Sequence, residues 1–304
     1  MLRSSLLFAS ALLAFPVLAQ NSAATAARAP ECLVRMNATP TSWLIQGFDP
    51  FGDQNAEATF SISFVNEGGA QCRFAPVFEL AQPPFGLSAA QARRIGYALV
   101  NLTDSQDVTP RAGRSLRTPS QRELILAPNE SKTLLYKLVA NPEDIRDAGT
   151  FTQDVSVEAQ DRSFRSFGGT RIVLGLEVLP SARMGLSGAY SMSDGHAVVD
   201  LGDLRTGVAP VPLQLRVSST GQYDLQVTSA NSGKLRLGAS DWTVPYSIAV
   251  GGTSVNLAGT SRLSGPTGNG YRRDSLPIQF IIGDVSDRRA GTYSDVISIS
   301  VTAR

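Results

Sequence analysis

The chain has 304 residues, and its 27 Lys and Arg against 26 Asp and Glu give a formal net charge of +1 at pH 7. No long run of either sign interrupts this balance, so the sequence predicts no nucleic-acid partner and no binding to an acidic membrane surface. The roughly 285 residues that follow a leader are enough to bury two hydrophobic cores.

Residues 1–19 have the features of a secretory signal peptide. Arg3 lies in a short n-region, an apolar stretch runs from Leu6 to Leu18, and Ala19 precedes the expected cleavage site. No later segment holds the uninterrupted apolar run, about eighteen residues or more, that a transmembrane helix needs. We therefore expect a secreted chain that crosses the periplasm, with a flexible N-terminus at residues 20–30.

The two cysteines, Cys32 and Cys72, both lie in the first half of the chain. An exported protein meets an oxidising compartment, and an even number of cysteines is typical of paired ones. The sequence therefore predicts one disulfide between them. Two free thiols are the alternative.

Short runs of alternating apolar and polar residues dominate the chain. They are separated by turn residues, among them many of the 27 Gly and 17 Pro. The clearest runs are Phe60, Ile62 and Phe64; Leu213, Leu215 and Val217; and Ile297, Ile299 and Val301. A period of two is that of a strand with one buried face. The pattern predicts an all-β chain built from antiparallel sandwiches of the immunoglobulin-like type.

Two segments about 142 residues apart align without a gap. Residues 134–151 (LLYKLVANPEDIRDAGTF) match residues 276–293 (LPIQFIIGDVSDRRAGTY), with Ala-Gly-Thr at the same place in both. Tyr97 and Tyr246 begin similar segments that precede these motifs by comparable distances. Because the period is one domain length and too long for a solenoid repeat, it predicts two tandem copies of one domain. We place them at residues 31–179 and 180–304.

The second copy ends in a sequence with a family resemblance. Ala-Gly-Thr-Tyr-Ser-Asp at residues 290–295, followed by an alternating strand, resembles the closing signature of spore coat protein U domains. Residues 178–181 (VLPS) and 199–202 (VDLG) resemble the opening strand and glycine turn of that domain, and residues 47–50 (GFDP) resemble its aromatic-Asp-Pro segment. Arg183 departs from the family, which often has a cysteine there, and Cys72 follows the Gly68-Gly69 turn where the family's cysteine precedes it.

The resemblance implies a role and an incomplete fold. Such domains are secreted pilins of archaic chaperone-usher fimbriae, and each lacks the last strand of its sandwich. A neighbouring subunit supplies that strand, which pairs with an open sheet edge and covers core side chains. The implied partners are a fimbrial subunit that donates a strand, a periplasmic chaperone and an outer-membrane usher.

The segment between the two copies has the pattern of such a strand. In residues 171–179 (RIVLGLEVL), alternate positions are large and apolar: Ile172, Leu174, Leu176 and Val178. Because the segment follows the first copy directly, we expect it to close the first sandwich from within the same chain. An ordinary last strand of a complete domain makes the same structural prediction.

The two ends of the chain differ from this segment. Residues 20–30 (QNSAATAARAP) lack alternating large apolar residues, and no strand follows Ile297, Ile299 and Val301 before Arg304. We therefore expect a second sandwich that accepts a strand and an N-terminus that does not donate one. This describes a tip adhesin at the cell surface, active in attachment and biofilm. A structural fimbrial subunit and a two-domain periplasmic chaperone are the alternatives.

Little in the sequence indicates catalysis. His196 is the only histidine, it follows Asp194-Gly195 in an expected turn, and no nucleophile, metal-binding or phosphate-binding motif accompanies it. We expect a protein that is not an enzyme and holds no cofactor or metal. For adhesion, the apolar residues Phe85 and Leu87 of the Pro-rich segment 83–87 are the first candidates and Trp43 with Leu44 the second. Core packing is the alternative for both pairs.

Overall fold

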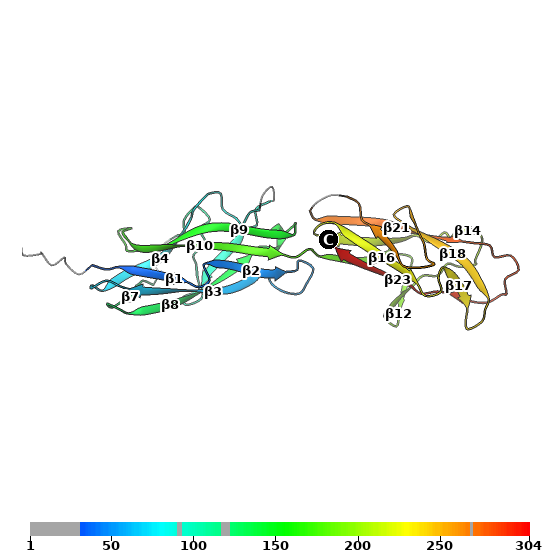
Figure 1. Ribbon diagram of the computed structural model, residues 1–304, viewed down its shortest axis with the longest axis horizontal. Coiled ribbons are helices and arrows are strands. Elements are labelled where there is room, and N and C mark those ends of the chain that lie inside the picture. The colour runs from blue at the N-terminus through cyan, green and yellow to red at the C-terminus, as the bar shows by residue number, and fades with distance from the viewer. Residues whose placement is uncertain (1–30, 90–92, 117–121, 268–269) are drawn as a thin grey trace, which may run out of the picture.

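The computed structural model describes residues 31–304, apart from residues 90–92, 117–121 and 268–269. The described chain forms two β-sandwiches that follow each other end to end (Figure 1). The all-β prediction is confirmed, and the only helical element among the described residues is the 3-10 turn at Pro142–Asp144. No described helix is long and apolar enough to span a membrane. The expected leader and the segment 20–30 lie outside the described residues.

The first sandwich consists of two five-stranded sheets. Their strand orders are β1-β3-β8-β5-β6 and β2-β10-β9-β4-β7. The strands are β1 (Val34–Ala38), β2 (Ser42–Phe48), β3 (Glu57–Asn66), β4 (Cys72–Leu80), β5 (Tyr97–Asn101), β6 (Gln106–Asp107), β7 (Leu124–Leu126), β8 (Ser131–Ala140), β9 (Gly149–Gln160) and β10 (Ser166–Val178). Strand β10 lies inside its sheet, antiparallel to β9 and parallel to β2.

The second sandwich has one large sheet and one small one. The large sheet has the order β11-β15-β21-β18-β17-β22, and the small one has the order β20-β16-β23. Its strands are β11 (Ala182–Gly188), β12 (Ser191–Ser193), β13 (His196–Val198), β14 (Gly207–Val208), β15 (Leu213–Ser219), β16 (Tyr223–Ser229), β17 (Lys234–Leu237), β18 (Thr243–Val250), β19 (Thr253–Val255), β20 (Ser261–Ser264), β21 (Arg272–Ile282), β22 (Tyr293–Ser294) and β23 (Ile297–Ala303). Strands β12 and β13 form a separate hairpin.

The two sandwiches repeat the same strand pairing in the same register. Leu134 of β8 lies opposite Ile62 of β3, and Leu276 of β21 lies opposite Leu215 of β15. On the other side of the same strands, β5 pairs with β8 as β18 pairs with β21. In the opposite sheet, β9 pairs with β4 as β23 pairs with β16. The repeat in the sequence therefore corresponds to a repeat in the topology.

Each sandwich has its own core, and the two cores differ in how well they are covered. Among the described residues, the first cluster holds 33 buried hydrophobic residues with 6 partly buried ones packed against it. The second holds 16 buried residues with 13 partly buried ones. Nearly half of the apolar side chains of the second core thus keep contact with solvent. The second domain therefore has the less completely covered core.

Candidate functional site

The outer edge of β23 offers unpaired backbone groups. Within the described residues, β23 pairs only with β16. The N–H of Ala230 donates to the carbonyl of Val296, and the N–H of Arg304 donates to the carbonyl of Gln222. Because hydrogen-bonded pairs alternate in an antiparallel ladder, the even-numbered positions of β23 bond to β16 and the odd-numbered ones direct N–H and C=O to the free side.

The same odd-numbered residues of β23 also direct their side chains to the core. Ile297, Ile299 and Val301 pack against the second cluster, yet all three are only partly buried. The serines between them are exposed. One face of a single strand therefore combines unpaired main-chain groups with apolar side chains that are not fully covered, which is what an added strand would satisfy.

Strand β11 lies beside β23 and forms the opposite wall. It pairs only with β15 among the described residues, so its other side is free. Met184 lies opposite the buried Val217, which places its side chain on the core face, but it is 39% exposed. Leu186, opposite Leu215, is partly buried. We call Met184, Leu186, Ile297, Ile299 and Val301 the acceptor edge.

In the first sandwich the corresponding position is occupied by β10. This strand pairs with β9 on the side away from β4, and its Ile172 lies opposite Val155. The side chains of the predicted donor-like strand are all buried: Ile172 1%, Leu174 0%, Leu176 0% and Val178 1% exposed. As a result Val155, Val157 and Ala159 of β9 are 0% exposed. Their counterparts on β23 are Ile297, Ile299 and Val301, which have no such cover among the described residues.

A polar network closes the end of the acceptor edge where β23 begins. Asp295 accepts hydrogen bonds from the hydroxyls of Ser229 at 2.5 Å and Tyr246 at 2.6 Å, and from the N–H of Asn231 at 2.9 Å. Burial, and then the hydrogen bond to the Asp295 carboxylate, raise the pKa of Tyr246 well above its usual value. The network joins β16 and β18 to the chain just before β23, so it fixes the position from which the open strand starts.

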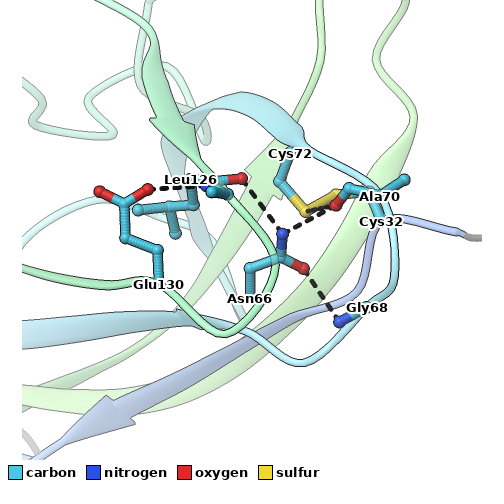
Figure 2. Close-up of a disulfide and its surroundings, with 8 residues drawn as sticks. Cys32, Asn66, Gly68, Ala70, Cys72, Leu126 and Glu130 are labelled. Atoms are coloured by element: carbon cyan, nitrogen blue, oxygen red, sulfur yellow. Dashed lines mark hydrogen bonds between the residues drawn. A yellow bond between two sulfur atoms is a disulfide. The ribbon is translucent and has the colours of Figure 1, made fainter.

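At the end of the first domain that lies away from the second, a disulfide and an amide side chain hold the loops (Figure 2). Cys32 and Cys72 are joined at 2.05 Å across 40 residues of sequence. The fully buried Asn66 donates to the carbonyls of Ala70 and Leu126 and accepts from the N–H of Gly68. A Cβ at Gly68 would lie 2.1 Å from a backbone oxygen, so only glycine fits this turn. These contacts make the far end of the first domain rigid.

Two of the four predicted adhesive residues are core residues, and that prediction is wrong for them. Trp43 and Leu87 are both 0% exposed. Trp43 stacks on Phe60 at 5.2 Å between ring centroids. Leu87 exchanges backbone hydrogen bonds with Ile95, and the side chains of both residues are buried in the core. Neither side chain can reach an external surface.

The other two predicted adhesive residues are half-buried. The ring of Phe85 packs on Tyr97 with centroids 4.6 Å apart, and its loop is held by Gln153, which bonds Gly86 and Pro84. Leu44 lies over the outer face of Gly175, where a Cβ would meet its methyl carbon at 2.7 Å. Both side chains therefore cover backbone or neighbouring rings and offer little free surface.

Sequence reasoning missed Phe164, the exposed aromatic residue of the β9–β10 turn. Its side chain is 65% exposed and its φ of 63° is in the left-handed region. The Asp161 carboxylate accepts from the N–H groups of Ser163 and Arg165, which fixes the turn. The guanidinium of Arg114 lies 5.8 Å from the centre of the Phe164 ring, and most of the side chain remains free for an external contact. The sequence DRSFR gives only a weak signal, because it reads as a solvated charged loop.

No catalytic arrangement is found among the described residues. His196 is exposed at the tip of the β12–β13 hairpin. In the part of the chain that the structure describes, no group of three His, Cys, Asp or Glu side chains could hold a metal ion.

Comparisons with known proteins give limited similarity. No protein-family model and no curated protein matches the chain, so the resemblance to spore coat protein U domains stays a prediction. Among solved structures, a chain of the chaperone–tip adhesion subunit complex from archaic Csu pili of Acinetobacter baumannii is 14% identical with a TM-score of 0.43, over 88% of this chain and 99% of that one. A tip adhesin of Pseudomonas aeruginosa is 10% identical (TM-score 0.37; 90% and 94% covered). The adhesive subunit CfaE of the CFA/I fimbria of enterotoxigenic Escherichia coli is 11% identical (TM-score 0.30; 89% and 81% covered). Similarity of this degree assigns neither function nor partner to this chain.

Proposed function

We propose that the protein is a tip adhesin-like subunit of an archaic chaperone-usher fimbria. Its second domain accepts a donor strand from the next subunit, and its first domain carries the contact with a surface, which supports attachment and biofilm. The observation that carries the proposal is the acceptor edge. There, unpaired main-chain groups and half-covered apolar side chains occur on the same three residues of β23, Ile297, Ile299 and Val301.

The first domain supports the tip position because, among the described residues, its β9, the strand that corresponds to β23, is paired on both sides. Its β10 already covers β9, and the inward side chains of both strands are buried. A domain closed in this way does not accept a strand, so only the second domain connects to the fibre. A periplasmic chaperone that protects the acceptor edge before assembly, and an usher that exports the subunit, are the partners that this proposal requires.

The decisive experiment supplies the missing strand within the same chain. A copy of residues 171–178 is appended after Arg304 through a short turn that places Ile172 of the copy opposite Val301 and Leu174 opposite Ile299. Covering the exposed parts of the five side chains of the acceptor edge contributes at most about 5 kcal/mol, at roughly 1 kcal/mol each. The melting temperature of the second domain should rise by about 10 °C or more, measured by differential scanning calorimetry.

The matched control carries the same extension with Asn at the four apolar positions. It offers the same main-chain groups but no apolar cover, so it should give a small fraction of the effect. Equal melting temperatures for the extended chain, the control and the original chain would exclude strand acceptance and with it the fimbrial role.

For adhesion, we propose Phe164 as a contact residue at the end of the first domain away from the fibre. Phe164→Ser should reduce attachment of bacteria that display the fimbria. It should lower the stability of the first domain by no more than about 1 kcal/mol, because the side chain is exposed and loses only its contact with Arg114. Leu135→Ser, an exposed leucine in the middle of β8, is the matched control and should leave attachment unaltered. Equal attachment for both variants would remove Phe164 from the adhesive surface.

A further inference from the structure

Only three residues, Leu179, Pro180 and Ser181, separate the last strand of the first domain from the first strand of the second. The N–H of Leu179 donates to the carbonyl of Phe48 in the first domain. The N–H of Ser181 donates to the hydroxyl of Thr220 in the second domain at 2.9 Å. A linker this short, containing proline and bonded at both ends, leaves few free torsions between β10 and β11.

Side chains from both domains pack against each other beside this linker. The ring of Phe51, in the first domain, lies 6.3 Å from the ring of Tyr271, in the second. The guanidinium of Arg183 lies over Phe51 at 5.2 Å, and that of Arg146 lies over Tyr271 at 5.5 Å. Both arginine contacts thus cross from one domain to the other. Arg273 covers Tyr271 as well and donates to its hydroxyl at 2.8 Å. We call these five residues the joint.

The joint and the acceptor edge share one strand. Arg183, which holds Phe51, is the neighbour of Met184, which lines the acceptor edge. Successive side chains of a strand point to opposite faces, so Arg183 is directed outward and Met184 inward from the same segment of β11. Any displacement of β11 therefore moves a contact of the joint and a wall of the acceptor edge together.

Strand β11 is also an edge strand of the large sheet of the second sandwich. It pairs on one side only among the described residues, and its inward side chains are partly uncovered. Few buried contacts and one free side are the conditions in which an edge strand moves. An added strand between β11 and β23 would restrict that movement, and so does the contact of Arg183 with the first domain.

We propose that strand addition at the acceptor edge and closure of the joint are coupled through β11, so that the angle between the two domains becomes fixed when the subunit is incorporated. This inference rests on the proposed function and names a regulation of the same site. Because coupling between two binding events is reciprocal, a closed joint favours strand addition and an added strand favours a closed joint. The joint is closed in the chain as it stands, and an added strand would reduce the fraction of time that it spends open.

The test measures the distribution of distances between the domains in the full chain. Spin labels are attached at Thr150→Cys in β9 and Gln226→Cys in β16, and the width of the distance distribution is measured by pulsed electron paramagnetic resonance. We expect the width to fall by about half when the strand of residues 171–178 is appended, and to stay unchanged with the Asn-substituted extension.

Two variants separate the coupling from a general effect on folding. Arg183→Ala should broaden the distribution in the extended chain at least twofold and reduce the gain in melting temperature that the appended strand gives. Arg205→Ala removes an exposed arginine just before β14, and it should change neither. An unchanged width despite a raised melting temperature would overturn the coupling and leave the proposed function intact. The proposed function itself fails if the melting temperature does not rise.

Discussion

The two domains share their strand order and register, and they differ in what lies beside one strand. In the first domain β9 has neighbours on both sides, and Val155, Val157 and Ala159 are completely buried. In the second domain β23 has one neighbour among the described residues, and its apolar side chains are half-covered. Topology alone therefore does not make a sandwich complete. One strand decides whether the same framework is a closed domain or a site for assembly.

The position that precedes the free strand shows how the two copies diverged. Gln153 of the first domain binds the backbone of Gly86 and Pro84 and so fixes a loop. The corresponding residue of the second domain is Asp295, which instead joins Ser229 and Tyr246 beneath the start of β23. The first domain uses this position to shape its surface, and the second uses it to hold the end of an open edge.

The largest expected difference between the copies is in the cost of truncating a large apolar side chain at or beside the strand position that only the first copy fills. Leu174→Ala in the first domain should destabilise that domain by about 2–5 kcal/mol, because it opens a cavity in a closed core. Ile299→Ala in the second should cost about 1 kcal/mol, since the side chain is already partly in water. Urea unfolding followed by domain-specific probes measures both. Similar costs at the two positions would contradict the difference in closure.

The disulfide should stabilise one domain only. Cys32→Ser with Cys72→Ser removes a bridge that spans 40 residues. The unfolded first domain then gains conformational freedom, which should lower its stability by about 2–4 kcal/mol. The second domain's transition in calorimetry should stay where it is, unless the joint transmits the loss. A shift of both transitions by the same amount would show that the domains unfold as one unit.

A smaller effect should appear at high pH. Burial raises the pKa of Tyr136 in the first core far above its usual value of 10, and the charge of Asp104 raises it further. A tyrosine whose folded pKa exceeds its unfolded pKa gives its full stabilisation below pH 10 and loses it as the pH rises beyond that value. Tyr136 should therefore contribute a loss of about 1 kcal/mol in the first domain between pH 9 and pH 10.5. Tyr136→Phe should remove this part of the loss and leave the part due to Tyr97, whose pKa burial also raises. A variant with the same pH dependence would show that other groups cause it.

The sequence predicts much of the framework and less of the surface. Alternation at Ile172, Leu174, Leu176 and Val178 predicted a strand with a buried face, because periodicity reports burial directly. The sequence leaves Trp43 and Leu87 open between adhesion and core packing, because local patterns do not reveal which strand covers a side chain. Which strand covers a side chain depends on the pairing register between segments that are distant in the sequence.

The open side of β11 at the acceptor edge and the joint could not be predicted from the sequence, for a related reason. Met184 reads as an ordinary strand residue, and only the absence of a neighbouring strand among the described residues makes it exposed. Phe51 and Tyr271 are far apart in the sequence and belong to different domains, so no local pattern connects them. Single-sequence patterns report the environment along one element, and these features arise between elements.

Residue-resolved amide hydrogen exchange tests the central claim most directly. In the chain as it stands, the amides of Ile297, Ile299 and Val301 should exchange rapidly, whereas those of Ser298, Ser300 and Thr302, which bond to β16, should be protected. The amides of β9 from Val155 to Ala159 should all be protected. Appending the strand of residues 171–178 should protect the three fast amides of β23 by about a hundredfold or more. Uniform protection along β23 in the original chain would mean that its outer edge is already paired, and the strand-acceptor role would be contradicted.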